Sequence, residues 1–254
     1  MELTLDRAPS LKEGDALPPL WHWLYFSEPV RQSDLGPDGH ERLGLFLPPV
    51  RYPRRMWAAS DLRFAAPLVL GRPAERTSAI EDVAFKRGRS GPLCFVTVRH
   101  RVTQDGRAAI DEVQTIVYRD ASAGSPAGGA AQTDSPAMPP GSARVYRIGR
   151  TQLFRYSALT FNAHRIHYDV PFAVEAEGYP GLIVHGPLLA SLMFDHGVKR
   201  GHGRPPGRFT FRAEQPVFED EAFWTEGEQD DAGVALRVTK AAGGVAMRGT
   251  LDFE

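Results

Sequence analysis

The sequence predicts an α+β protein that contains two copies of one structural unit. A low-complexity segment divides the chain near its middle, both halves end in strand-like segments, and two segments in equivalent positions share one layout. The 254 residues suffice for two small domains, and the content of 42% hydrophobic and 24% charged residues is ordinary for a globular protein.

The segment from 121 to 143 (ASAGSPAGGAAQTDSPAMPPGSA) consists almost entirely of Ala, Gly, Ser and Pro. Such a segment cannot bury enough apolar surface to offset the entropy that it loses on ordering, so we predict a flexible linker. The predicted domains are therefore residues 1–120 and residues 144–254, on either side of the linker 121–143.

Alternating residues and short turns predict antiparallel strands in both halves. In the first half, residues 94–98 (CFVTV) are rich in strand formers, and the pair Asp105-Gly106 is typical of a two-residue hairpin turn. In the second half, residues 233–254 alternate between apolar and polar around a Gly-Gly pair, which predicts another hairpin.

The two halves also resemble each other. The segment that begins at Leu62 (LRFAAPLVLGRPAERTSAIEDV) and the segment that begins at Phe209 (FTFRAEQPVFEDEAFWTEGEQD) have the same layout. Each contains an aromatic strand, a proline, an acidic or glycine-containing turn and a further strand. Similar segments at the same place within each half indicate an internal duplication.

A helix is predicted from about Pro187 to Arg200. Proline suits the first turn of a helix, where its missing N–H is not needed, and Gly201 provides a stop signal after two basic residues. The face of this helix that we expect in the core carries apolar residues at helical spacing, namely Leu188, Leu189, Leu192 and Met193.

Composition argues against several classes of partner and location. The formal net charge of −1 gives no reason to expect a nucleic acid or an anionic membrane as partner. The acidic N-terminus has no apolar core of a secretory signal, and no apolar run approaches the roughly 18 residues that cross a bilayer. Cys94 is the only cysteine, which leaves no intramolecular disulfide or cysteine-based zinc site, so a reducing, cytoplasmic location is expected.

Residues 157–169 (SALTFNAHRIHYD) form the strongest candidate site. His164 and His167 are three residues apart, as two metal ligands on a helix would be, and Asp169 is close. A zinc site usually needs three ligands in fixed geometry, and no third ligand is obvious unless His185 folds back. A metal site is therefore an alternative, and no metal is predicted.

Covalent catalysis and nucleotide binding have little support in the sequence. Ser157 lacks a nucleophile elbow, Cys94 lies in a predicted strand, and no glycine-rich phosphate loop is present.

General acid–base chemistry fits the cluster better. Histidine titrates close to neutral pH, and an adjacent amide such as Asn162 can hold a water or a carbonyl without ionising. The Gly186 N–H, at the start of the predicted helix, could hold a carbonyl oxygen that gains negative charge. This combination suits abstraction of a proton next to a thioester; the alternative is that His164 and His167 are ordinary polar residues of a loop.

Residues 156–169 (YSALTFNAHRIHYD) and 178–193 (GYPGLIVHGPLLASLM) resemble the MaoC-like hydratases and dehydratases of hotdog fold. The nearest branch comprises the type 2 hydroxyacyl-thioester dehydratases and the 3-methylfumaryl-CoA (mesaconyl-C4-CoA) hydratases. Three segments of the first half, MWAASDLRFAAPLVLG, IEDVAFKRGRSGPLCFVTVRHRV and DEVQTIVYRD, look like the degenerate N-terminal hotdog of these proteins. The resemblance covers most of the chain outside the linker and the extreme N-terminus.

The family motif implies catalytic residues by position. It runs aspartate, any residue, asparagine, proline, an apolar residue and histidine, and its aspartate and histidine activate water. Here His167 stands at the histidine, Asn162 at the aspartate, His164 at the asparagine and Arg165 at the proline. An amide is not a base, so His167 is the predicted base, Asn162 would orient the water, and His164 would be a second acid or a polar anchor.

The resemblance implies a double hotdog, with two curved antiparallel sheets, each wrapping a central helix, joined edge to edge. One active site per chain is expected, because only the second half carries the histidine motif; the first half would supply walls of an acyl or pantetheine channel. Homo-oligomers of the double hotdog are expected. The candidate substrate-binding residues are Tyr156, Arg165, His185, Lys199 and Arg200.

The predicted activity is that of an acyl-CoA hydratase or dehydratase that uses no cofactor, since the CoA is part of the substrate. His167 would remove a proton, from Cα in dehydration or from water in hydration, and the Gly186 N–H would hold the enolate oxygen. Candidate reactions convert 3-methylfumaryl-CoA to citramalyl-CoA or interconvert a 3-hydroxyacyl thioester and its enoyl form. The alternatives are a hotdog acyl-CoA thioesterase and a non-catalytic acyl-CoA binder.

Overall fold

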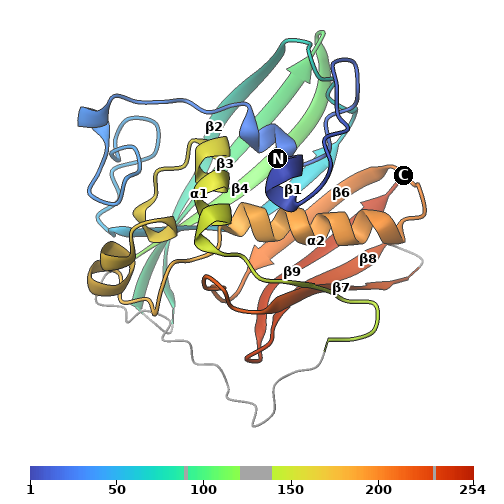
Figure 1. Cartoon of the computed structure of the whole chain (residues 1–254). Coiled ribbons are helices and arrows are strands. Elements are labelled where there is room, and N and C mark those ends of the chain that lie inside the picture. The colour runs from blue at the N-terminus through green and yellow to red at the C-terminus, as the bar shows by residue number, and fades with distance from the viewer. Residues whose placement is uncertain (89–90, 121–138, 231–232) are drawn as a thin grey trace.

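A single antiparallel sheet of nine strands dominates the computed structural model, which describes residues 1–88, 91–120, 139–230 and 233–254 (Figure 1). The strands follow the order β2-β3-β4-β1-β6-β9-β8-β7-β5 across the sheet. They are β1 (Arg54–Phe64), β2 (Ala74–Gly88), β3 (Gly91–Gln104), β4 (Arg107–Arg119), β5 (Arg144–Tyr146), β6 (Pro206–Ala213), β7 (Phe223–Gln229), β8 (Val234–Lys240) and β9 (Val245–Phe253).

The strand order repeats on both sides of the junction between β1 and β6. On one side β1 is followed by β4, β3 and β2, and on the other side β6 is followed by β9, β8 and β7. Leu62 and Phe209, where the two similar sequence segments begin, are direct partners in the antiparallel pairing of β1 with β6. The duplication predicted from the sequence is therefore visible as two equivalent four-stranded units that meet in the middle of one sheet.

The predicted turns lie between the expected strands. Asp105 and Gly106 both have positive φ and connect β3 to β4, as a two-residue hairpin turn of type I′ requires. Gly243 and Gly244 also have positive φ and precede β9. The predicted linker lies for the most part, at 121–138, outside the described residues.

The predicted helix is confirmed as α2 (Gly186–Arg200), which crosses the strands of the second half (Figure 1). Pro187 lies in its first turn, and Leu188, Leu192 and Met193 are almost fully buried. Gly197 allows the close approach of helix and sheet, because a Cβ there would lie 2.8 Å from a methyl group of Leu236. The remaining helical segments are η1 (Glu2–Leu5), η2 (Trp21–Leu24), η3 (Gln32–Asp34), α1 (Arg150–Thr160), η4 (Arg165–His167) and η5 (Phe172–Ala176).

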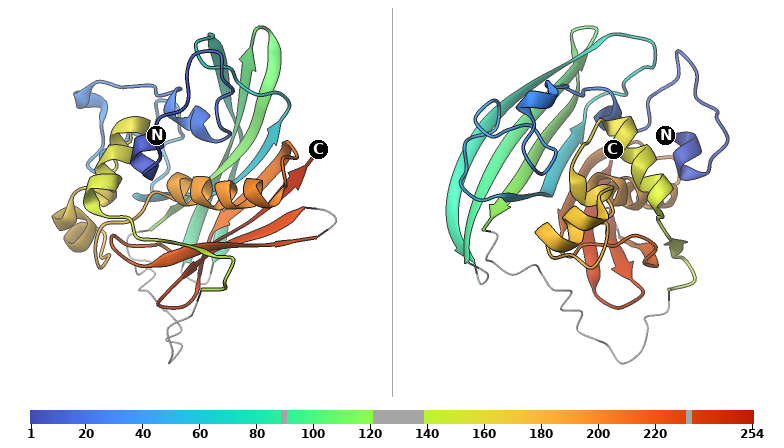
Figure 2. Two further views of the ribbon diagram at one scale, coloured as in Figure 1. Left: turned by 45° about the vertical axis from the view of Figure 1, so that its right-hand side comes forward. Right: turned by 60° about the vertical axis from the view of Figure 1, so that its left-hand side comes forward.

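The first half has no central helix of its own among its described residues, which differs from the expectation of one helix in each half. Its only helical segments are the 3-10 turns η1, η2 and η3, because residues 1–53 lack a sustained helical pattern of apolar residues and are interrupted by prolines. In Figures 1 and 2 this segment and α1 lie on the same side of the sheet as α2. Trp21 of η2 and Leu153 of α1 join the same hydrophobic core as the strands of both halves.

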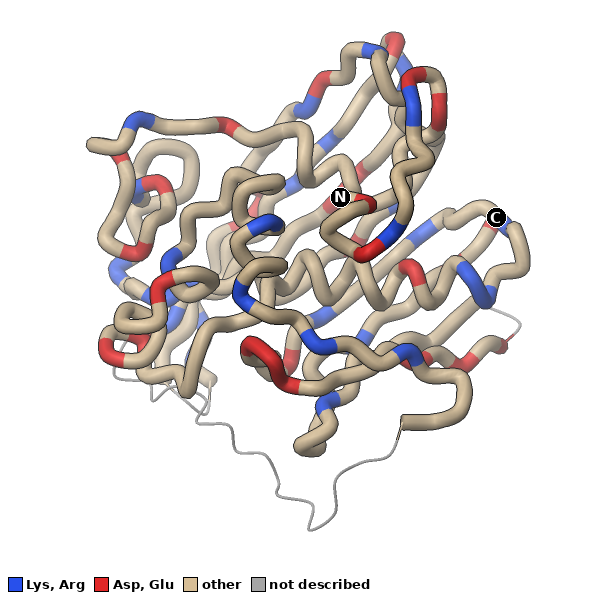
Figure 3. Tube along the Cα trace, viewed as in Figure 1, with Lys and Arg blue, Asp and Glu red and all other residues tan. Residues whose placement is uncertain are grey.

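Charged residues of both signs are interspersed along both halves in the view of Figure 3, in keeping with the net charge of −1. Among the described residues, no helix combines the length and the apolar character needed to cross a bilayer.

Gly249 of β9 tests the contact between the sheet and α2. A Cβ at this position would lie 2.5 Å from the Thr210 carbonyl oxygen and 2.8 Å from the Met193 methyl group, so backbone would have to move. We expect Gly249→Ala to lower the free energy of unfolding by about 1–3 kcal/mol in urea titrations. Gly141→Ala, at an exposed site with nothing within 4 Å, is the control, and equal stability of the two variants would contradict the packing described here.

Candidate active site

A cavity of about 720 Å³ lies where the strands of the first half meet the start of α2. This volume is in the range of small-molecule and cofactor sites. Five of the candidate site residues line it, and they come from α1, from the segment that follows α1 and from the start of α2. They are Tyr156, Asn162, His164, His167 and Gly186.

His167 has a fixed orientation and a fixed tautomer. Its Nδ1 donates a hydrogen bond of 2.8 Å to the Ile183 carbonyl oxygen, so its Nε2 carries the lone pair. Burial lowers the pKa of His167 to about 4, although the hydrogen bond to Ile183 opposes this shift. The imidazole is therefore neutral at pH 7 and able to accept a proton.

His185 lies behind His167 and stacks on it, with ring centroids 3.7 Å apart. His185 does not line the cavity, so its position differs from the predicted contact with the substrate. Its Nε2 lies 2.9 Å from Ser157 Oγ, and burial, together with the nearby His167, lowers its pKa well below the usual value. His185 thus fixes one face of His167 and joins α1 to the start of α2.

Asn162 and His164 form a short turn at the edge of the cavity. Asn162 Oδ1 accepts a hydrogen bond of 3.0 Å from the His164 backbone N–H, which leaves the side-chain amide nitrogen as the donor that could face a ligand. Burial, then the nearby His167 and Arg55, lowers the pKa of His164 to about 2. His164 is therefore uncharged at neutral pH.

The predicted oxyanion-binding group stands at the first residue of α2. Gly186 lines the cavity, and the N–H groups of a first helical turn have no partner within the helix and lie at its positive end. Because Pro187 has no N–H, Gly186 supplies the outermost donor. The nearest atom to a Cβ at Gly186 would be the Trp57 carbonyl oxygen, 4.0 Å away, so this approach is open.

Arg165 does not line the cavity. Its guanidinium donates to Asp169 Oδ2 at 2.7 and 2.9 Å and to the Pro37 carbonyl oxygen at 2.9 Å, and it lies over the Phe172 ring. The backbone N–H of Arg165 donates to the Asp38 carbonyl oxygen at 2.9 Å. Arg165 therefore holds the N-terminal loop against the histidine motif, which differs from the predicted contact with the substrate.

Lys199 and Arg200 are also separate from the cavity. They belong to the last turn of α2, and thirteen residues at 1.5 Å each put Lys199 about 20 Å from Gly186. They line a smaller depression of about 280 Å³, together with His196 and Tyr146. Basic residues in the last turn of a helix stabilise its dipole, and this explains their position without a ligand.

The first half supplies side chains that the sequence alone did not identify. Asp38 and His40 belong to a loop that contacts the histidine motif, and Arg54 and Arg55 begin β1. The cavity is lined by His40, Arg54 and Arg55. The sequence signals were a Pro-Asp-Gly-His turn and an Arg-Arg pair after a proline, but neither pattern indicates a site by itself.

Glu112 of β4 forms a polar floor in the first half of the cavity. Burial alone would raise its pKa, but hydrogen bonds from His22 and Trp23 hold the pKa of Glu112 below its usual value. Ser60 donates a further hydrogen bond of 2.8 Å to its other oxygen. The Glu112 carboxylate is thus bound by three side chains of the first half.

Three of these groups could hold a metal ion together. Asp38, His40 and His164 offer ligand atoms that lie within 4.8 Å of one another. This set differs from the alternative raised by the sequence, which combined His164, His167 and His185. The guanidinium of Arg55 lies 3.9 Å from Asp38 and would repel a second cation there, and a direct hydrogen bond already joins Asp38 to His40.

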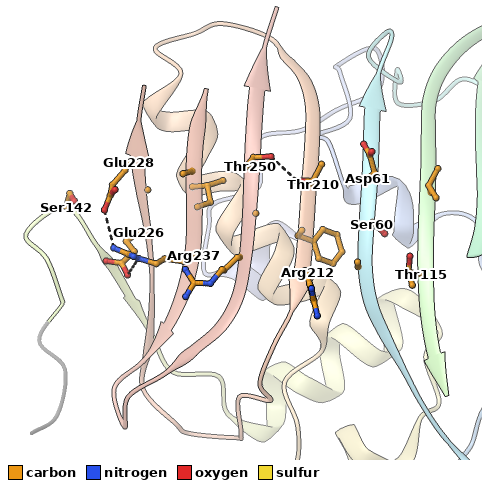
Figure 4. Close-up of a pocket in the computed structure, with 18 of the residues that line it drawn as sticks. Ser60, Asp61, Thr115, Ser142, Thr210, Arg212, Glu226, Glu228, Arg237 and Thr250 are labelled. Carbon is orange, nitrogen blue, oxygen red and sulfur yellow. Dashed lines mark hydrogen bonds and ion pairs between the residues drawn. The ribbon is translucent and has the colours of Figure 1, made fainter. Parts of the chain in front are cut away.

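A second hollow of about 650 Å³ lies on the face of the sheet that is turned away from α2 (Figure 4). Side chains alternate along β6, so that Phe209 and Phe211 join the core while Thr210 and Arg212 point into this hollow. Its Arg237 is paired with Glu226, and Thr210 is hydrogen bonded to Thr250. Among the described residues no histidine lines this hollow, so the clustered histidines lie at the cavity on the other face.

Comparison with known proteins agrees with the expected family. The chain matches the model of the hydroxyacyl-thioester dehydratase type 2 family over residues 20–219. It is similar to a mesaconyl-C(4)-CoA hydratase of Chloroflexus aurantiacus, with 43% identity over 238 residues that cover 93% of this chain and 84% of that protein.

Solved structures show the same fold. A MaoC-like dehydratase from Phytophthora capsici gives a TM-score of 0.61 at 16% identity, over 86% of this chain and 80% of that one. A Mycobacterium tuberculosis protein described as a double hotdog gives 0.51 at 12% identity, over 80% of this chain and 76% of that one. The predicted double hotdog is confirmed.

The buried His167 makes stability depend on pH. An unfolded chain binds its proton with a pKa near 6.5, whereas the folded protein binds it only near 4. Between these values the unfolded state holds more protons, so the free energy of unfolding falls as pH falls from about 6.5 to 4, by up to about 3 kcal/mol from this residue. Urea titrations at pH 7 and pH 5 should show a smaller loss in His167→Gln; an equal loss in both proteins would argue against a buried, neutral His167.

Proposed function

Because this chain belongs to the hydroxyacyl-thioester dehydratase type 2 family, it is a hydro-lyase of acyl thioesters, and we propose that it hydrates a branched, unsaturated dicarboxylyl-CoA. The leading substrate is 3-methylfumaryl-CoA (mesaconyl-C4-CoA), which would give citramalyl-CoA. The observation that carries the proposal is the neutral His167 imidazole, fixed beside the free N–H group at the start of α2.

The thioester carbonyl oxygen would accept a hydrogen bond from the Gly186 N–H. Hydration places negative charge on this oxygen while the enolate exists, and a preorganised donor at a helix start stabilises that charge without reorganisation. His167 lies close to this donor, since its ring stacks on His185, the residue before Gly186. Its Nε2 would therefore face Cα. In dehydration it would remove a proton from Cα, and in hydration it would first take up a proton and then give it to Cα. No cofactor takes part in the proposed reaction.

A carboxylate on the substrate would be bound by the arginines that begin β1. In 3-methylfumaryl-CoA the free carboxylate is attached to Cβ, so it lies beyond Cα as seen from the thioester. Arg55 lines the cavity near Asp38, and its charge contributes to the lowered pKa of His164. Arg54 is paired with Glu177, and its Nη1 is buried without a partner among the described residues. Guanidinium groups bind carboxylates through paired hydrogen bonds, which supports a dicarboxylyl substrate.

The proposed reaction predicts a spectroscopic change with a panel of enoyl-CoA esters. Absorbance of the conjugated enoyl thioester should fall when protein is added to 3-methylfumaryl-CoA, and His167→Ala should lower kcat by about 100-fold or more, because acid–base catalysis contributes that much. Release of free thiol would indicate a thioesterase instead, and thermal stabilisation by CoA esters without turnover would indicate a binding protein. Full activity of His167→Ala would refute the role given to this residue.

The carboxylate contact predicts a change in selectivity. Arg55→Met should raise KM for 3-methylfumaryl-CoA by about 10- to 100-fold, since a charge-assisted hydrogen bond contributes about 1.5–3 kcal/mol. KM for crotonyl-CoA, which has no carboxylate, should change little. Arg63→Met, at an exposed site on the same strand, is the control. A similar loss for both substrates in Arg55→Met would show that Arg55 does not recognise the carboxylate.

A further inference from the structure

The position of the family aspartate, held here by Asn162, has no carboxylate that could activate the water. An amide cannot accept a proton at neutral pH. In the proposed hydration His167 Nε2 faces Cα, so a second group is sought that could take a proton from the water that adds to Cβ. Two imidazoles of the first half line the cavity and have a carboxylate beside them, His22 with Glu112 and His40 with Asp38. The Glu112 carboxylate is already bound by Trp23 and Ser60, and only His40 also contacts the histidine motif, at His164.

Asp38 and His40 form a hydrogen-bonded pair on a short loop. His40 Nδ1 lies 2.8 Å from Asp38 Oδ2, and the His40 backbone N–H donates to Asp38 Oδ1 at 3.1 Å. The Gly36 N–H donates to the His40 carbonyl oxygen at 2.7 Å and closes the loop. With Asp38 ionised, Nδ1 is the donor to the carboxylate, so His40 Nε2 carries the lone pair. A carboxylate that holds an imidazole in this way orients it and stabilises its protonated form.

The loop is fitted closely to the histidine motif. Arg165 binds it twice, through its backbone N–H to the Asp38 carbonyl oxygen and through its guanidinium to the Pro37 carbonyl oxygen, both at 2.9 Å. Gly39 has a φ of +87°, and a Cβ there would lie 1.9 Å from the Ala163 carbonyl oxygen. Only glycine permits this contact, so the position of His40 relative to the motif is built into both segments.

Four imidazole rings follow one another from the start of α2 to this loop. The ring centroids are 3.7 Å apart for His185 and His167, 5.5 Å for His167 and His164, and 4.0 Å for His164 and His40. A thioester whose oxygen lies at Gly186 puts Cα next to His167, and its Cβ extends away from the helix start. The water that attacks Cβ would then lie toward His40.

We propose that His40, oriented by Asp38 at the far end of this imidazole row, is the base that activates the water. This inference rests on the proposed hydration. As the water oxygen bonds to Cβ, one water proton passes to His40 Nε2 and the double-bond electrons move toward Cα and the thioester oxygen. His40 then gives this proton up to solvent, and His167, which takes up a proton from solvent at Nε2, delivers that proton to Cα. The net change is the addition of one water, and every residue returns to its starting state.

The decisive experiment separates hydration from exchange at Cα. In His40→Gln, we expect kcat for hydration of 3-methylfumaryl-CoA to fall by about 100-fold or more, with KM changed by less than about threefold. The same variant should still exchange the Cα hydrogens of the saturated analogue 3-methylsuccinyl-CoA with D₂O, because His167 is intact. His167→Gln should lose both activities, and Asp38→Asn should lower hydration while retaining exchange.

His202→Gln, at an exposed position after α2, is the matched control and should retain both activities. Hydration by His40→Gln at close to the wild-type kcat would overturn the inference and leave the proposed function intact. Parallel loss of hydration and exchange in His40→Gln would also overturn it, because this result would show that His40 has a structural role. If the wild-type protein hydrated no enoyl-CoA, the proposed function would fail, and the inference with it.

Discussion

The hydrogen bond from His167 Nδ1 to the Ile183 carbonyl oxygen is the interaction on which the rest of the site depends. It joins the loop after α1 to the segment that leads into α2, so one contact positions both His167, the proposed proton-transfer residue, and Gly186, the proposed donor to the thioester oxygen. It also fixes the tautomer, which leaves Nε2 free on the cavity side. Burial keeps His167, His164 and His185 uncharged, and their rings can therefore pack against one another without repulsion between cations.

The two duplicated halves differ in what covers their strands. The second half keeps a helix, α2, packed across its strands, and the positive end of this helix would face the thioester in the proposed reaction. The first half lacks such a helix among its described residues, and the cavity extends over its strands at Arg55, His100 and Glu112. The space above these strands thus holds the proposed substrate site, and the loop with Asp38 and His40 closes one end of it.

Local patterns in the sequence were sufficient for the hairpins, for α2 and for the duplication, but not for the absence of a central helix among the described residues of the first half, and they identified only part of the candidate site. Glycine and aspartate turns, the helix from Pro187 and the similarity of the two halves all reflect short-range rules of backbone geometry and periodicity. His167, His164 and Asn162 were identifiable because they lie within one short motif. The contact of His40 with His164 joins residues more than 120 positions apart, and it depends on a left-handed glycine that no periodic pattern reveals. Arg165, Lys199 and Arg200 were assigned by charge alone, and charge does not indicate which way a side chain points.

A crystal structure with bound citramalyl-CoA would test the central claim, that the acyl group lies along the imidazole row with its thioester at α2. The thioester oxygen should lie within hydrogen-bond distance of the Gly186 nitrogen. Cα should lie next to His167 Nε2, and the hydroxyl on Cβ should lie next to His40 Nε2, with the free carboxylate at Arg55. A product bound in the opposite direction, or with its hydroxyl beside His167 and out of reach of His40, would contradict the account.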